Sequence, residues 1–290
     1  MAAFDRIVIV DWSANSTPKR GRDSIWVAQL TGGELQVANP PTRAAAIALL
    51  SDAVGEAHRS GDRVLVGVDF SLGFPAGTAG ALDLDGGDWS AMWSMLADRV
   101  HDDERNRNNR FELASQLNGR IAATTPGPFW GCPPRRATRH LTTTKVPAEP
   151  LPTWRAVESL LRARGLRPFS AWQLLGAGAV GSQSLLGIAA VAGLVDALRA
   201  RSIGVDVWPF TSGFGVPTAP VVVAEIWPSL IELDESDAAT VRDRRQVVSL
   251  ATHLASIDLA AYFAPACRAD LDRETIAAAL GEEGWILGVA

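Results

Sequence analysis

The stretches IVIVDWS (residues 7–13) and VLVGVDFSLGFP (residues 64–75) decide the fold expected for this chain. Each begins as a run of apolar, strand-forming residues and reaches a carboxylate, Asp11 in the first and Asp69 in the second. Such runs predict buried strands, and an acid at the carboxyl end of a strand lies at the sheet edge where α/β folds bind ligands. The two stretches therefore predict a pair of acids at one edge of a sheet.

The residues around these stretches predict three strands, a helix and a fourth strand. The expected strands are residues 6–10, 24–30, 34–37 and 63–70. Thr42 is expected to cap a helix whose apolar positions continue to Ala57. This βββαβ order, with an acid after the first and fourth strands, predicts an α/β protein with the mixed sheet of a ribonuclease H-like core.

The regular alternation stops after Pro75, and residues 76–200 are interpreted as a large, partly helical insertion over the sheet. We expect one domain over residues 1–290 that contains this insertion. The further helices are expected from residue 89 and at 154–164, 188–201, about 237–262 and 272–280. The further strands are expected at 203–210, at 221–227 and in the terminal GWILGV, and Glu282 and Glu283 are interpreted as a surface turn before the last one.

The composition indicates a folded, soluble chain. At 290 residues and 47% hydrophobic, the chain can bury a large core, and its charged fraction of 20% is ordinary for a soluble protein. The longest small apolar stretch, residues 185–195, is too short to span a bilayer. Cys132 and Cys267 lie far apart without a CxxC partner, which disfavours a disulfide framework or a thiolate metal site. We therefore expect a cytoplasmic protein that has no membrane partner.

The middle of the chain is basic, although the whole chain has a net charge of −5. Residues 99–167 hold 13 Lys/Arg against 6 Asp/Glu. A basic surface suits phosphate-rich partners, because neutralising phosphates releases counterions. The alternative is that the arginines reflect genome composition, since only Lys19 and Lys145 are lysines. If the basic surface is functional, nucleic acid is the partner that it predicts.

Three acids at strand ends predict a site for phosphodiester hydrolysis. Such chemistry needs several carboxylates around Mg²⁺ or Mn²⁺, with one cation activating water and another stabilising the leaving oxygen. Asp11 and Asp69 supply two ligands, and Glu225 in VVVAEIWPSL supplies a third. The alternatives are turns in which the aspartates accept from the backbone near Ser13 or Ser71, and a half-exposed edge position for Glu225.

The fourth ligand is expected on the helix that follows, where two acids compete. Asp243 and Asp258 are 15 residues apart, which corresponds to about 22 Å along a helix, so they cannot share one site. We prefer Asp243, because it comes shortly after the strand that carries Glu225, and Gln246 lies on its face of the helix. The alternative for Asp243 is an acid that stabilises the N-terminus of the helix.

Five segments together resemble an uncharacterised bacterial family of predicted nucleases with a ribonuclease H-like fold. They are DWS at Asp11, GVDFSLGFP at Asp69, AEIWPS at Glu225, DRRQV at Asp243 and EEGWILGV at the end. The resemblance implies that Asp11, Asp69 and Glu225 ligate metal. This chain differs from many relatives in having Trp12 in place of glycine, and its region 76–200 is longer than in the shorter relatives.

These observations predict a divalent-metal-dependent nuclease that acts on DNA or RNA. One alternative is a nucleotide-binding phosphotransferase of the actin-like or sugar-kinase type, which shares the core topology, but neither acidic motif has the DxG arrangement of its phosphate loops. Another is a non-catalytic module that binds nucleic acid or protein. The candidate substrate contacts are Trp12, Ser13, Ser71, Arg135, Arg136, Arg139, Gln183 and Gln246.

Overall fold

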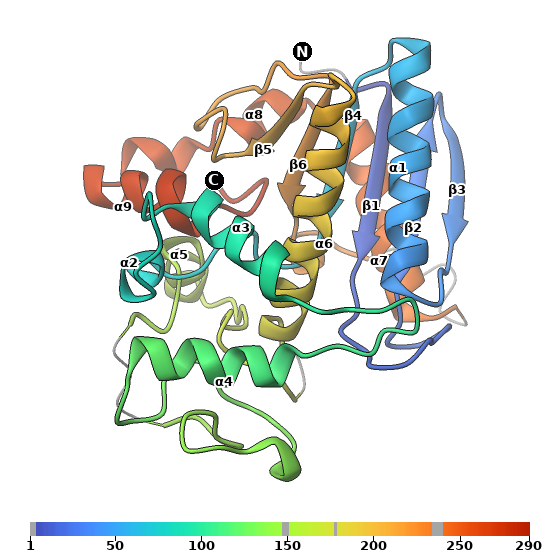
Figure 1. Cartoon of the computed structure of the whole chain (residues 1–290). Coiled ribbons are helices and arrows are strands. Elements are labelled where there is room, and N and C mark those ends of the chain that lie inside the picture. Colours follow the sequence, from blue (N-terminus) through green and yellow to red (C-terminus); the bar gives the residue numbers. More distant parts are fainter. Residues whose placement is uncertain (1–3, 147–150, 177–178, 234–239) are drawn as a thin grey trace.

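The centre of the molecule is a six-stranded mixed sheet with the strand order β3-β2-β1-β4-β6-β5 (Figure 1). The computed structural model describes residues 4–146, 151–176, 179–233 and 240–290. The strands are β1 Arg6–Asp11, β2 Trp26–Thr31, β3 Glu34–Ala38, β4 Val64–Val68, β5 Val205–Trp208 and β6 Val221–Glu225. The expected α/β class is therefore confirmed.

The register of the parallel strands brings their carboxyl ends to one level. β1 pairs with β2 and β2 with β3 in antiparallel fashion, whereas β1, β4, β6 and β5 run parallel. Val68 lies opposite Val10 on one side and Glu225 on the other. The backbone N–H of Asp69 still donates to the carbonyl of Val10, at 3.2 Å. Asp11, the last residue of β1, and Asp69, the first residue after β4, therefore lie at adjacent strand ends.

Helices cover both faces of the sheet, with α1 and α6 in front and α7 behind in the view of Figure 1. The α-helices are α1 Arg43–Ser60, α2 Thr78–Ala81, α3 Trp89–Arg99, α4 Arg110–Ile121, α5 Ala156–Ala163, α6 Gly181–Ala200, α7 Arg242–Ser256, α8 Leu259–Phe263 and α9 Arg273–Ala278. The shorter turns are η1 Pro134–Arg136, η2 Pro228–Leu230, η3 Ala266–Ala269 and η4 Ala279–Glu283.

The alternation of strand side chains divides the apolar interior into two cores. Val8 and Val10 belong to the core beneath α1 and α6, whereas Ile7 and Ile9 belong to the core beneath α7. Fully burying one such side chain contributes about 1.5–3 kcal/mol. On α6, a Cβ at Gly187 would overlap the ring of Phe70, so the glycine lets this helix approach the strand end that carries Asp69.

By length and composition α6 could also cross a membrane, but 67% of its apolar window is buried inside the molecule. It therefore has the character of a core helix.

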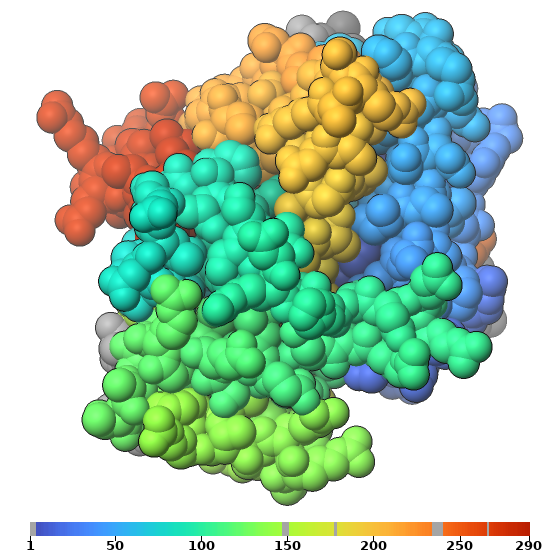
Figure 2. Space-filling model, in the orientation of Figure 1, coloured from blue at the N-terminus to red at the C-terminus, as the bar shows by residue number. Residues whose placement is uncertain are grey.

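The residues between β4 and α6 pack partly on the first core and partly below the sheet. Figure 2 shows the green segments of this region gathered beneath the sheet and its helices. The side chain of Asn118 holds the loop after α4, since it bonds to both backbone groups of Phe129 and to the carbonyl of His140. Phe74, Phe129 and Trp172 pack on one another and join this region to the sheet.

Several element boundaries differ from those expected. The Thr42 cap is confirmed, because its hydroxyl accepts from Ala45 N–H. α6 begins seven residues before the expected residue 188. Two helices, α7 and α8, take the place of the single helix expected at 237–262. Residues 237–239 of that expected helix lie outside the described residues. The side chain of Asp258 caps α8 and so separates it from α7. GWILGV forms an isolated bridge between Ile286 and Glu225 in place of a strand.

Candidate active site

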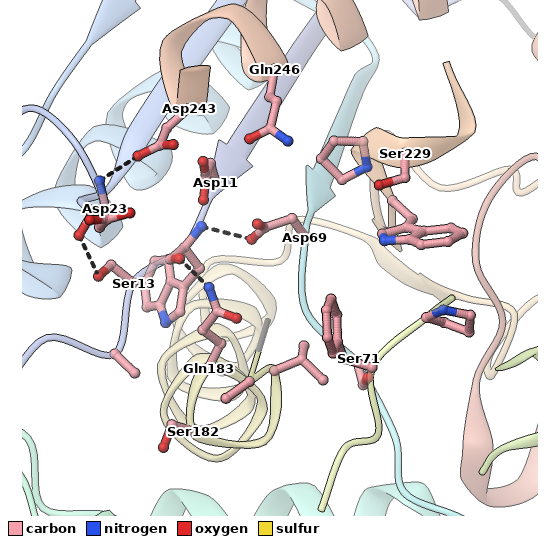
Figure 3. Close-up of a pocket in the computed structure, with 18 of the residues that line it drawn as sticks. Asp11, Ser13, Asp23, Asp69, Ser71, Ser182, Gln183, Ser229, Asp243 and Gln246 are labelled. Carbon is pink, nitrogen blue, oxygen red and sulfur yellow. Dashed lines mark hydrogen bonds between the residues drawn. The ribbon is translucent and has the colours of Figure 1, made fainter. Parts of the chain in front are cut away.

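A cavity of ≈ 1100 Å³ opens at the carboxyl edge of the parallel strands. Its walls come from the segments after β1, β4 and β6, from the start of α6 and from the first turns of α7. Figure 3 shows acids from three of these elements directed toward one another. This is the part of an open α/β sheet where ligands are expected to bind.

Asp11 and Asp69 have neighbouring carboxyl groups in this cavity. Burial is the main cause that raises the pKa of Asp11 well above its usual value, and the nearby Asp69, Asp243 and Asp23 raise it further. Burial also raises the pKa of Asp69 to about 6, against the lowering effect of hydrogen bonds from Trp12 N–H, at 2.7 Å, and from Asp11. Ionisation of both carboxyl groups is therefore unfavourable, because two buried charges of the same sign repel each other.

Asp243 is the third acid of this cluster. It lies in the first turn of α7, and its carboxylate accepts from the backbone N–H of Asp23 at 2.6 Å. Its charge raises the pKa values of both Asp11 and Asp69. Val247 and Leu250 of α7 pack in the core behind the sheet, which fixes the start of the helix beside the strand ends. Asp258 caps α8 and does not line the cavity, so the structure brings Asp243 to the pair.

Glu225 lines the same cavity but has a different environment. Its two oxygens accept from Arg155 at 2.6 and 2.8 Å, and one also accepts from the Leu72 N–H at 3.1 Å. The residue is only 4% exposed. To ligate a metal, Glu225 would have to leave this guanidinium, so its role as a ligand stays a prediction.

Arg155 organises a buried network beside the cavity. Its guanidinium also donates to Glu158 and to the carbonyl of Glu283. Burial and the charge of Glu225 raise the pKa of Glu158 to about 7, although Arg155 lowers it, because a single cation serves two carboxylates. The carboxylate of Glu283 accepts from Ala76 N–H and Ala156 N–H. Glu283 is 4% exposed, so its interpretation as a surface turn is wrong.

Most of the predicted substrate contacts near the acids pack against or form hydrogen bonds with other residues of the protein. Trp12 is 1% exposed and packs against Phe70, which excludes it as a stacking surface for a base. Gln183 of α6 donates to the carbonyl of Trp12 at 2.5 Å, and so holds the backbone beside Asp11. Ser71 lines the cavity but is buried.

Ser13 and Gln246 also line the cavity. The Ser13 hydroxyl accepts from the Asn15 side chain at 2.7 Å. The side chain of Gln246 points toward Asp11 and Asp69 in Figure 3. Of the predicted contacts, Gln246 is therefore the one that is best placed to contact a ligand at the acids.

The three predicted arginines, Arg135, Arg136 and Arg139, are exposed and do not line the cavity. Arg136 forms an ion pair with Glu112 on the surface. The cavity instead contains Arg110, which the sequence did not single out, because nothing in RNRNNRFEL (residues 105–113) distinguishes a buried arginine from exposed ones.

The acids could hold a metal through oxygen donors, which suit Mg²⁺ and Mn²⁺. Among the residues that the structure describes, no group of three or more His, Cys, Asp or Glu side chains already has the arrangement of a metal site.

Comparisons with models of protein families, with curated proteins and with solved structures found no match to this chain.

Proposed function

We propose that this chain is a nuclease of ribonuclease H-like type that hydrolyses phosphodiester bonds with Mg²⁺ or Mn²⁺. The observation that carries the proposal is the cluster of Asp11, Asp69 and Asp243. Within the described part of the chain, none of these three acids forms an ion pair with an arginine or lysine. Placing three carboxylates together without a cation raises the free energy of the folded protein, unless a positively charged ligand binds between them.

The raised pKa values support a cation as that ligand. Asp11 and Asp69 cannot both ionise easily, because burial and mutual repulsion oppose it. A bound divalent ion would remove this opposition and keep the carboxylates ionised. Asp11, Asp69 and Asp243 would hold the metal, which supplies an activated water and stabilises the leaving oxygen.

The sheet topology supports the ribonuclease H-like assignment. Three antiparallel strands, β3, β2 and β1, continue into the parallel strand β4, with α1 between β3 and β4 in the chain. Asp11 ends β1 and Asp69 directly follows β4, which agrees with the positions of the acids in the family that the sequence resembles. The fold and the acids therefore agree with the same class of enzyme.

The neighbouring residues would keep the cluster in place. Trp12 N–H holds Asp69, the Asp23 N–H holds Asp243, and Gln183 fixes the backbone of Trp12. These groups position carboxylates before a ligand arrives, which reduces the ordering that binding requires. Gln246 would orient a water or a phosphate oxygen at the acids.

The test is cleavage of labelled single strands, duplexes, RNA–DNA hybrids and junctions with Mg²⁺ or Mn²⁺, and with EDTA as a blank. We expect the wild type to cleave at least one substrate and Asp69→Asn to lose at least about 100-fold in rate. Asp258→Asn is the matched control, because asparagine also caps helices and the residue lies outside the cavity.

Cleavage that is equal in Asp69→Asn and wild type would refute the proposed site. Oligonucleotide binding without any cleavage, unaffected by Asp69→Asn, would favour a binding module on the same fold. Metal-dependent transfer of phosphate from a nucleotide, in place of strand cleavage, would favour the phosphotransferase.

A further inference from the structure

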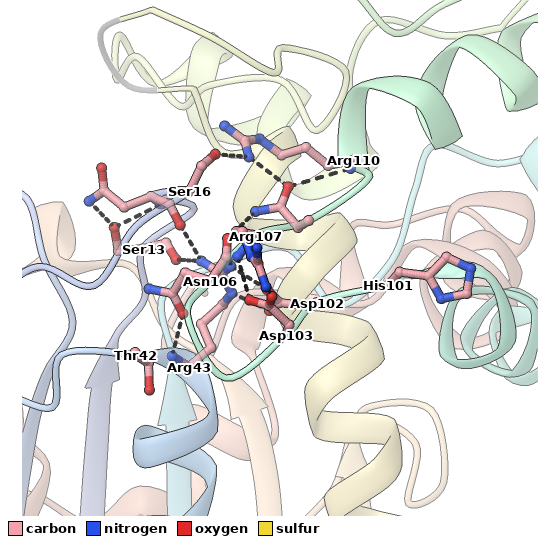
Figure 4. A network of polar contacts seen from close by, with 12 residues as sticks. Ser13, Ser16, Thr42, Arg43, His101, Asp102, Asp103, Asn106, Arg107 and Arg110 are labelled. Atoms are coloured by element: carbon pink, nitrogen blue, oxygen red, sulfur yellow. Dashed lines mark hydrogen bonds and ion pairs between the residues drawn. The ribbon is translucent and has the colours of Figure 1, made fainter.

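Arg110 is a buried cation in the wall of the cavity that contains the acids. It is the first residue of α4 and is 8% exposed. Its guanidinium donates to Ser182 Oγ at 3.0 Å, to Ser16 Oγ at 2.9 Å and to Asn108 Oδ1 at 2.7 Å. Figure 4 shows the hydrogen bond from Arg110 to Ser16, which lies in the segment after β1. All three partners are neutral.

Across the described residues, no carboxylate lies within ion-pair distance of Arg110. Asp102 and Glu112 are near enough to influence its charge, but Asp102 is paired with Arg43 and Glu112 with Arg136. Burial and Arg43 lower the pKa of Arg110 to about 10, so the group is still positive at neutral pH.

The two other buried arginines, unlike Arg110, form ion pairs with carboxylates. Arg43 and Arg155 are each 1% exposed, and each binds at least one carboxylate in addition to backbone carbonyls. A buried charge without a partner of opposite sign is costly. Arg110 thus has the environment of a receptor for an anion rather than that of a completed ion pair.

The guanidinium is also held rigidly. Its hydrogen bonds join α4 to α6 and to the segment after β1, and it lies 4.4 Å from the centre of the Phe111 ring. A guanidinium fixed in this way loses little side-chain entropy on binding. Its Nε and Nη1 atoms are used by these hydrogen bonds, so Nη2 is the atom that would donate to a phosphate oxygen.

A chain of contacts joins Arg110 to the acid cluster. Arg110 bonds to Ser182, and the next residue, Gln183, bonds to the carbonyl of Trp12, which follows Asp11. Both groups line one cavity, with the carboxylates at one part of its wall and the guanidinium at another. A strand that places one phosphate at a metal on the acids would bring another phosphate along this wall.

We propose that Arg110 binds a backbone phosphate of the nucleic-acid substrate, on the same strand as the phosphate that reacts at Asp11, Asp69 and Asp243. The inference rests on the proposed function, since it takes the nuclease substrate as the ligand.

Fluorescence anisotropy with a labelled single-stranded oligonucleotide in EDTA, over a series of salt concentrations, tests this role without any metal. We expect Arg110→Gln to weaken binding about tenfold and to reduce the slope of log K against log salt by roughly 0.7, the value for one phosphate contact on a single strand. Arg110→Lys should bind with intermediate affinity, because it keeps the charge but lacks the planar guanidinium that Ser182, Ser16 and Asn108 hold in place.

Arg59→Gln is the matched control, because it removes an exposed arginine near the end of α1, outside the cavity wall. Thermal melts show whether each variant folds, and if Arg110→Gln does not, the weaker binding of Arg110→Lys carries the test. The inference would be overturned if the folded Arg110 variants bound with the affinity and the salt slope of the wild type. It would also be overturned if the wild type did not bind the oligonucleotide.

The outcomes for the two proposals are separable. Binding that depends on Arg110 in a protein that cleaves nothing would refute the nuclease and keep the phosphate site. Cleavage that depends on Asp69, with binding insensitive to Arg110, would keep the nuclease and refute the phosphate site.

Discussion

Two groups of acids line the same cavity and differ in what balances their charge. Asp11, Asp69 and Asp243 have backbone N–H groups and each other as partners. Glu225 and Glu158 surround the guanidinium of Arg155, which supplies a cation from the chain itself. Among the described residues the first group has no cation as a partner, and the proposed metal would supply one, whereas the second group already contains Arg155.

The difference shows that an acid at a strand end does not by itself define a metal ligand. Asp69 and Glu225 both follow or end a buried parallel strand, and their strands are hydrogen-bonded neighbours. What separates them is the residue that packs opposite, which is a second acid for Asp69 and an arginine for Glu225.

The largest effect is expected from removing the internal cation. Arg155→Met leaves the Glu225 and Glu158 carboxylates buried without their cation, which should lower the free energy of unfolding by about 3–5 kcal/mol. Urea denaturation at neutral pH measures this loss. The double variant Arg155→Met/Glu225→Leu should recover part of it, and a loss below about 1 kcal/mol in the single variant would contradict the paired-network interpretation.

Metal binding should stabilise the first group by a smaller amount. Mg²⁺ or Mn²⁺ at about 100 times its Kd should raise the free energy of unfolding by about 2.7 kcal/mol. Thermal and urea unfolding with and without metal should show this increment in wild type and in Glu225→Gln, but not in Asp69→Asn. Loss of the increment in Glu225→Gln as well would show that Glu225 is a ligand, as the sequence predicted.

Without metal, the first group should make the protein less stable as the pH rises. Burial raises the pKa of Asp69 from an ordinary value of 3.8 to about 6 in the folded state. The folded protein therefore holds the proton more tightly than the unfolded chain, and stability falls between about pH 4 and pH 6.

We expect urea unfolding in EDTA to show a loss of about 1–2 kcal/mol over this window, which Asp69→Asn should remove. The remaining slope in that variant should belong to Asp11 and Glu158, because burial also raises the pKa of each. An identical pH dependence in wild type and Asp69→Asn would show that the aspartate pair does not share a proton.

The smallest effect is expected at the competing acid, Asp258. Asp258→Asn keeps a side chain that can accept from Ala260 N–H, so stability should change by less than about 0.5 kcal/mol. Calorimetric titration should give the wild-type metal affinity in this variant and a weaker one in Asp243→Asn. The reverse result would place the ligand on α8 rather than on α7.

The sequence predicted the parts of the fold that depend on local patterns. Apolar runs located β1 to β4 within a few residues, and Thr42 located the start of α1, because period and capping are local properties. The pairing of Glu225 with Arg155 could not be predicted, since it joins residues 70 positions apart through an insertion. For the same reason nothing in the chain distinguished the buried Arg110 from the exposed Arg135 and Arg139.

The segment 282–289 forms hydrogen bonds with the loop after β4 and with the end of β6, where Glu225 lines the cavity. Glu282 and Glu283 bind the backbone N–H groups of Gly77 and Ala76, and the Leu287 N–H donates to the carbonyl of Glu225 at 2.8 Å. On a ribosome that adds about 5–20 residues per second, Glu282 is added about 10–40 s after Asp69. The nascent chain therefore carries Asp11 and Asp69 long before the segment that closes their pocket has been synthesised, so the complete site forms only near the end of translation.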